Sequence, residues 1–139
     1  MMKERVTIPC IFLLAVFLAA CTKQNDQNII LPERTDVIKI VFITEDNQKS
    51  VVEKGKIDDL MFGLSTIEHK AFDSYQDTPQ ADDYVEIVFE TPRGKSSKVY
   101  IFKLGNDFFI EQPYTGIFAI DENLYDSILA SCSEETITP

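Results

Sequence analysis

The sequence has little of the chemistry on which most enzymes depend. It contains a single histidine, His69, and a Ser-His-Asp or Cys-His arrangement would have to include it. No serine lies in a Gly-x-Ser-x-Gly motif, and a histidine-based zinc site lacks partner ligands. The calcium-loop pattern Asp-x-Asp-x-Asp-Gly is also absent. We therefore predict no catalytic residue, no metal site and no cofactor, and we expect His69 to be structural or exposed to solvent.

Positive charge is scarce as well. The chain has 13 Lys and Arg residues against 23 Asp and Glu residues, and its formal net charge is −10. A surface of this sign is repelled by phosphate backbones and gains nothing from anionic lipid headgroups. We therefore expect no nucleic acid among the partners of this protein.

An uncharged run lies at the N-terminus. Lys3 and Arg5 precede residues 6–20, which carry no charge and have an apolar centre. As a helix, these residues would span roughly 22 Å at about 1.5 Å per residue, which is less than a hydrocarbon core of about 30 Å. A basic start, a short apolar run and small residues at its end are typical of a signal peptide, which we predict over residues 1–20.

The end of this run indicates which kind of signal peptide it is. The motif Leu18-Ala19-Ala20-Cys21 resembles the bacterial lipobox. This resemblance implies that the Cys21 thiol carries a diacylglycerol and that the chain is cut just before it. Two acyl chains hold a protein stably on a bilayer, and the implied location is therefore the extracytoplasmic face of the cell membrane. The alternatives are a signal anchor, or an ordinary cleaved signal followed by an incidental cysteine.

The part after the signal peptide is long enough for one domain. Residues 1–20 hold two basic residues and one acidic residue, so the remaining 119 residues carry a net charge of −11. We predict a lipidated N-terminus and flexible tether over 21–34, a single domain over 35–132 and a polar tail over 133–139. As an alternative, Ile29 to Leu31 packs onto the domain as a short edge segment.

The three cysteines do not predict a disulfide. Cys10 leaves with the signal peptide and Cys21 is the lipid attachment site, so Cys132 remains alone. We expect Cys132 to be a partly buried apolar residue at the end of a helix. The alternative is an exposed thiol that pairs with another molecule.

Hydrophobic periodicity predicts the fold class. Apolar stripes at helical spacing occur over 57–67 and 124–132, and Asp121 is a suitable N-cap for the second helix. Strand patterns occur over 37–43, 84–91, 97–104, 108–112 and 117–120, with weaker candidates at 50–53 and 69–75. We predict an α+β domain of β-α-β-β-β-β-α order, in which an antiparallel sheet of four to six strands carries two helices on one face. This order is similar to folds of the TATA-binding and helix-grip type.

Acidic residues form three near pairs: Asp58 with Asp59, Asp82 with Asp83, and Glu86 with Glu90. Glu86 and Glu90 lie on one face of a strand about 13 Å apart, which exceeds the roughly 5–9.5 Å that separate glycosidase carboxylates. A solvated sheet face explains these acids, and weak surface calcium binding is the alternative.

Aromatic residues gather around a Pro/Gly bend over 108–118. Rigid aromatic side chains suit recognition, and we take Phe109, Tyr114 and Phe118 as a candidate binding surface. The alternative is that Phe108, Ile110 and Phe118 complete the core while Tyr114 closes the sheet corner. The run Gln112-Pro113-Tyr114-Thr115-Gly116-Ile117-Phe118 resembles small Gram-positive lipoprotein domains of unknown function, over residues 36–130. That resemblance implies no activity.

These features predict a non-enzymatic binding or interaction module of the cell envelope. It would contact the membrane through the lipid on Cys21 and bind an envelope protein or a glycan. A lipoprotein inhibitor or immunity factor that acts against a basic secreted protein is the alternative. A small carboxylate-dependent envelope hydrolase is a further alternative.

Overall fold

The computed structural model describes residues 28–133, except for the side chains of Lys95 and Ser96. The predicted signal peptide, the predicted lipid attachment site Cys21 and the predicted tail from residue 134 lie outside the described residues. Among the helices of the described part, none has the length and apolar content needed to cross a bilayer.

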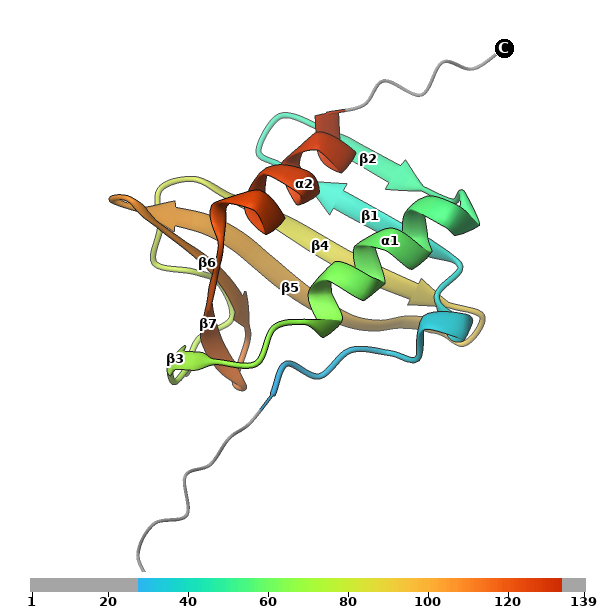
Figure 1. Cartoon of the computed structure of the whole chain (residues 1–139). Helices are drawn as coiled ribbons and strands as arrows, with labels where there is room; N and C mark the ends of the chain where they lie inside the picture. Colours follow the sequence, from blue (N-terminus) through green and yellow to red (C-terminus); the bar gives the residue numbers. More distant parts are fainter. Residues whose placement is uncertain (1–27, 134–139) are drawn as a thin grey trace, which may run out of the picture.

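One antiparallel sheet and two helices make up the fold of residues 28–133 (Figure 1). The strands are β1 (Lys39–Ile43), β2 (Gln48–Val51), β3 (Lys70–Phe72), β4 (Tyr84–Thr91), β5 (Gly94–Leu104), β6 (Asp107–Gln112) and β7 (Gly116–Ile120). The helices are α1 (Lys54–Ser65) and α2 (Glu122–Ser133), with a short 3-10 turn η1 (Arg34–Asp36) before β1. The strand order in the sheet is β2-β1-β4-β5-β6-β7-β3.

The predicted α+β class with an antiparallel sheet is confirmed, but the strand count and order need correction. The sheet of the described residues has seven strands rather than four to six, and the order along the chain is β-β-α-β-β-β-β-β-α. The added strands, β2 and β3, contain four and three residues and form the two edges of the sheet. Strands this short carry little periodic signal, because the alternation of side chains needs several residues to show.

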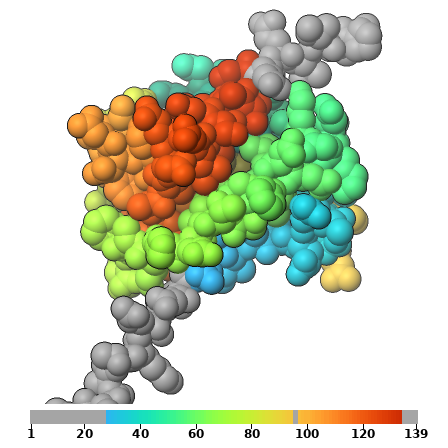
Figure 2. Space-filling model, viewed as in Figure 1, coloured from blue at the N-terminus to red at the C-terminus, as the bar shows by residue number. Residues whose placement is uncertain are grey.

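Both helices pack on one face of the sheet (Figure 1). The space-filling view shows them side by side across this face (Figure 2). Alternate strand residues point toward them and form the core with the apolar helix stripes. Burial of each large aliphatic side chain stabilises the fold by about 1.5–3 kcal/mol. The fully buried members of this core include Ile40, Phe42, Leu64, Ile87, Phe89, Val99, Ile101, Ile110, Phe118 and Ile128.

One glycine lets the two helices approach closely, and one side chain caps the start of α2. Gly63 of α1 faces Leu124 of α2, and a Cβ atom at position 63 would approach Leu124 Cδ1 to 3.0 Å. The small residue therefore permits the close approach of the two helices. The start of α2 is capped as predicted, because the Leu124 N–H donates to Asp121 Oδ1 at 2.7 Å.

Cys132 lies near the end of α2 and is partly buried against the core, as the sequence predicts. It is a free cysteine. Burial raises the pKa of its thiol, and the nearby Lys49 opposes this shift.

The face of the sheet opposite the helices is also covered in part. Tyr100 is buried there at 1% exposure. The connection between β3 and β4 contributes Ser74, whose Oγ donates to the buried Glu111 Oε1 at 2.6 Å. Gln76 Nε2 donates to the same oxygen at 3.4 Å. This connection is therefore tied to β6.

The first described residues lie against the domain. Ile29 and Leu31 pack on the core, in agreement with the alternative prediction for this segment. Between them, the Ile30 N–H donates to Gln112 Oε1 and Gln112 Nε2 donates to the Ile30 carbonyl, each at 2.7 Å. The part of the predicted tether from residue 28 onward therefore belongs to the folded domain.

Candidate functional site

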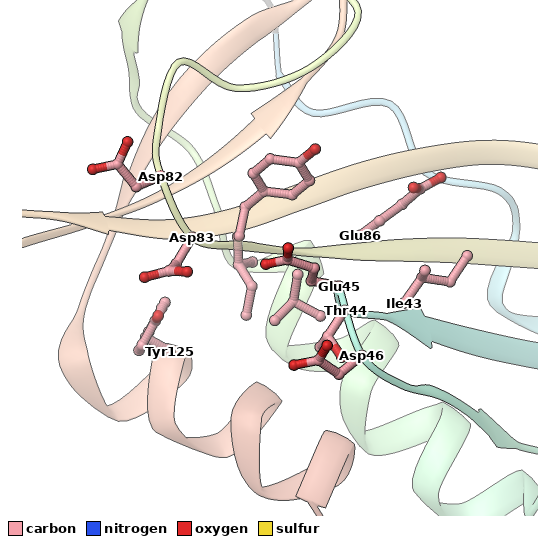
Figure 3. Close-up of a pocket in the computed structure, with 11 residues that line it drawn as sticks. Ile43, Thr44, Glu45, Asp46, Asp82, Asp83, Glu86 and Tyr125 are labelled. Atoms are coloured by element: carbon pink, nitrogen blue, oxygen red, sulfur yellow. The ribbon is translucent and has the colours of Figure 1, made fainter.

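A cavity of about 670 Å³ lies where the β1–β2 turn, the start of β4 and helix α2 meet (Figure 3). Its wall combines apolar side chains with a group of carboxylates. The lining residues are Ile43, Thr44, Glu45, Asp46, Asp82, Asp83, Tyr84, Val85, Glu86, Ile101 and Tyr125. We call this the acidic cavity.

Local hydrogen bonds build one side of the acidic cavity. The Thr44 N–H donates to the Asn47 carbonyl at 2.8 Å, and the Asn47 N–H donates to Thr44 Oγ1 at 3.1 Å. These bonds close a tight turn and leave Glu45 and Asp46 exposed at its tip. Two consecutive acids on a short turn therefore face the cavity without being desolvated.

Strand register brings the other acids to the same place. Ile43 at the end of β1 pairs with Glu86 of β4, so the residues that lead into β4 lie beside the β1–β2 turn. Those residues include Asp82 and Asp83. In Figure 3 they approach the cavity from the side opposite Glu45 and Asp46.

The acidic cavity is strongly negative. Glu45, Asp46, Asp82, Asp83 and Glu86 line it, and none of its described lining residues is a Lys, Arg or His. The first four are exposed and Glu86 is half-buried, with Lys98 Nζ at 3.9 Å from Glu86 Oε1. Carboxylates gathered around a concave surface raise the local concentration of cations.

Tyr125 gives the cavity an aromatic wall. Its ring packs on Phe108 with the ring centroids 4.8 Å apart. Burial raises the pKa of the Tyr125 hydroxyl, and the charges of Asp126 and Asp83 raise it further, so the phenol stays neutral at physiological pH. Val85 and Ile101, which also line the cavity, add apolar surface to this ring. An organic cation with an alkyl stem fits such a wall, because its charge and its carbon chain both find partners.

The pair Asp58 and Asp59 lies outside this cavity, and so does Glu90, although its predicted partner Glu86 lines it. Asp58 lies near Arg34 and Lys54, and Glu90 pairs with Lys39 at 2.8 Å across neighbouring strands. These acids belong to surface ion pairs. No group of three or more metal-ligating side chains comes together within residues 28–133. His69 is exposed.

The three residues of the predicted aromatic surface differ in their exposure to solvent. Phe118 is 0% exposed and part of the core, so it does not contribute to a surface. Phe109 is half-buried and packs between Phe102 and Phe72, with centroid distances of 5.7 and 6.3 Å. Tyr114 is 66% exposed.

Tyr114 lies at the tip of the β6–β7 turn with a φ angle of 60°, a left-handed conformation that is uncommon for residues other than glycine. Its hydroxyl donates to Asp77 Oδ1 at 2.8 Å, and this hydrogen bond raises the pKa of Tyr114 above its ordinary value. Two other exposed aromatic residues that the sequence did not single out, Phe72 and Tyr75, lie in β3 and directly after it. Their only signal was the weak strand pattern over 69–75.

Sequence reasoning also missed the acidic cavity as a unit. It marked Asp82, Asp83 and Glu86 as members of near pairs but did not single out Glu45 and Asp46. The two groups are far apart in the sequence, and only the pairing of β1 with β4 unites them.

Comparison with known proteins gives a family and a fold. A family model described as a domain of unknown function (DUF5300) matches residues 25–119. The chain is similar to a solved structure described as the NMR structure of the protein from Ruminococcus gnavus, with 26% sequence identity and a TM-score of 0.58. That match covers 69% of this chain and 97% of the other. No curated protein matches the chain.

Proposed function

The chain belongs to the family described as a domain of unknown function (DUF5300), and since that description assigns no activity, we propose a function from the geometry. The protein is a membrane-anchored, extracytoplasmic binding module that acts without catalysis. Its acidic cavity receives the lysine or arginine side chains of a basic envelope protein. The observation that carries this proposal is the set of five carboxylates around a partly apolar cavity.

The chemistry of the cavity favours binding over hydrolysis. A carboxylate hydrolase needs one acid that stays protonated near neutral pH, and burial is the usual cause of such a state. Glu45, Asp46, Asp82 and Asp83 are instead exposed to solvent. Carboxylates gathered on an exposed concave surface attract cations, which suits the recognition of basic side chains.

A binding experiment with a matched control tests the cavity. The full lipidated protein is titrated with acetylated tetra-arginine amide, and binding is followed by calorimetry at low ionic strength. We expect the Asp82→Asn/Asp83→Asn variant to lose affinity by about tenfold or more, since two charges leave the cavity. The Asp58→Asn/Asp59→Asn variant removes the same charge elsewhere and should change affinity by less than about twofold. Equal losses of affinity in the two variants would show that net charge alone controls binding, and they would refute a specific site.

The proposed anchor is tested separately at Cys21. Cys21→Ala should leave an uncleaved or shed protein without lipid, because the lipobox cysteine is the residue to which the diacylglycerol would be joined. Mass spectrometry of the N-terminal peptide measures the lipid directly. Continued lipid labelling of this variant would contradict the assignment.

An inhibitor or immunity factor is a second candidate, favoured by the same excess of carboxylates. It requires that occupation of the cavity block the activity of a basic secreted protein. A basic partner captured from the envelope would be assayed alone and with the protein. Loss of its activity, restored by the Asp82→Asn/Asp83→Asn variant, would favour this candidate over a passive binding module.

A further inference from the structure

The place where the chain enters the domain sets the distance between domain and anchor. The described chain begins at Asn28, beside β3 and the β6–β7 turn (Figure 1). The hydrogen bonds between Ile30 and Gln112 fix this entry point. Asn28 lies seven steps along the chain from Cys21, and at about 3.5 Å per step the two residues are no more than about 25 Å apart. An anchor on Cys21 therefore keeps this end of the domain close to the bilayer.

Exposed apolar side chains gather at the same end. The described residues expose nine large apolar side chains, and four of them belong to the segments at this end of the domain. They are Ile30, Phe72, Tyr75 and Tyr114, which are 65%, 60%, 80% and 66% exposed. We call them the anchor-side patch.

Described contacts hold the patch together. Ile30 is bonded to Gln112, two residues before Tyr114, and Phe72 pairs in register with Ile117 of β7. Lys70 in β3 lays its side chain on Gly116, where a Cβ atom would come within 2.6 Å of Lys70 Cδ. The four side chains of the patch therefore come from segments that meet at one corner of the sheet.

Charges within the patch have partners. Asp73 Oδ1 accepts a hydrogen bond from Lys70 Nζ at 2.7 Å, and Asp73 Oδ2 accepts one from the Tyr75 hydroxyl at 3.0 Å. The Tyr114 hydroxyl donates to Asp77. Tyrosine rings with a bonded hydroxyl are suited to the boundary between lipid and water, where aromatic residues are enriched. Tyr114 also holds a left-handed backbone conformation, and such strained residues cluster at functional positions.

We propose that the anchor-side patch docks on the headgroup region of the bilayer that carries the Cys21 lipid. This inference rests on the proposed anchor. The driving force is the burial of apolar and aromatic surface, because the chain after residue 20 carries a net charge of −11 and gains nothing from anionic lipid.

Docking in this way orients the acidic cavity. The patch is built around β6, β7 and β3, whereas the cavity is built around β1 and β4 in the other half of the sheet order. The cavity therefore stays open to partners while the patch faces the lipid.

The sequence has no tryptophan, so a single introduced tryptophan reports on its own position. The full lipidated protein is reconstituted on phosphatidylcholine vesicles with brominated acyl chains, in the variants Tyr75→Trp and Tyr114→Trp. Val52→Trp is the matched control, because Val52 is 68% exposed and follows β2 at the opposite edge of the sheet. We expect quenching at least about twofold stronger at positions 75 and 114 than at position 52, unchanged in 0.5 M salt, because apolar burial is not screened.

Three outcomes are distinguished. Strong quenching at positions 75 and 114 alone supports docking. Equal quenching at all three positions, in protein that floats with the vesicles, overturns docking and leaves the anchor intact. Protein that fails to float overturns the anchor and this inference together. Two probe positions keep the test decisive if one variant does not fold.

Discussion

Replacing Gln112 by alanine should release the N-terminal segment from the domain. Gln112 is buried at 7% exposure, and its amide forms two hydrogen bonds of 2.7 Å with the backbone of Ile30. This pairing imitates a strand contact, although Ile30 belongs to no strand. Ile29 and Leu31, on either side, depend on it to remain against the core.

The magnitude follows from the two bonds. Each contributes about 1 kcal/mol net, so their joint loss lowers the free energy of opening the segment by about 2 kcal/mol. At 1.4 kcal/mol per factor of ten, this corresponds to about a 30-fold loss of protection for the Ile30 amide against hydrogen exchange. Gln112→Glu distinguishes the contributions of the two hydrogen bonds. Its carboxylate still accepts a hydrogen bond from the Ile30 N–H, but it has no donor for the Ile30 carbonyl.

Hydrogen exchange of the full chain, read at the Ile30 amide, is the assay. The exposed Gln80 provides a control, since Gln80→Ala removes the same side chain from the surface. Unchanged protection of Ile30 in Gln112→Ala would show that the segment is held by Ile29 and Leu31 alone, and it would refute the reasoning.

Three further predictions concern the core, a helix cap and a tyrosine. Phe118→Ala should lower the free energy of unfolding by about 3–5 kcal/mol in urea denaturation, because Phe118 is fully buried; a loss below about 1 kcal/mol would contradict its place in the core. Asp121→Ala should cost about 1 kcal/mol by the same assay through loss of the cap on α2, and Asp121→Asn should restore most of it. The hydrogen bond to Asp77 raises the pKa of Tyr114 above 10.0, so this contact is fully present below pH 10 and is lost as the pH rises through the folded-state pKa. Ring-carbon NMR titration should show the Tyr114 pKa falling toward 10.0 in Asp77→Asn, and an unchanged value would exclude the bond as the cause.

The elements that bury one face were predictable from the sequence. The predicted apolar stripe at Ile57, Leu60, Met61 and Leu64 is buried along α1. The predicted strand over 84–91 forms as β4, and its residues Val85, Ile87 and Phe89 alternate toward the core. Such patterns are local, so a single segment contains the whole signal.

The surface features depend on contacts between distant segments and were only partly predictable. Alternation in β7 shows that Phe118 and Ala119 face opposite ways, but only the packed sheet shows that the Phe118 face is the one under the helices. The acidic cavity requires the register of Ile43 with Glu86. No spacing within the sequence encodes that pairing, because register is set jointly by both strands and by what covers them.

The two short edge strands have a consequence for a protein held at high density on a surface. An open sheet edge is a template on which a neighbouring copy can add a strand, and long flat edges favour aggregation. Here β2 offers four residues, while β3 offers three and its pairing with β7 carries a register shift. Short and irregular edges leave few backbone groups in line for a second copy, so crowding would favour separate molecules over stacked sheets.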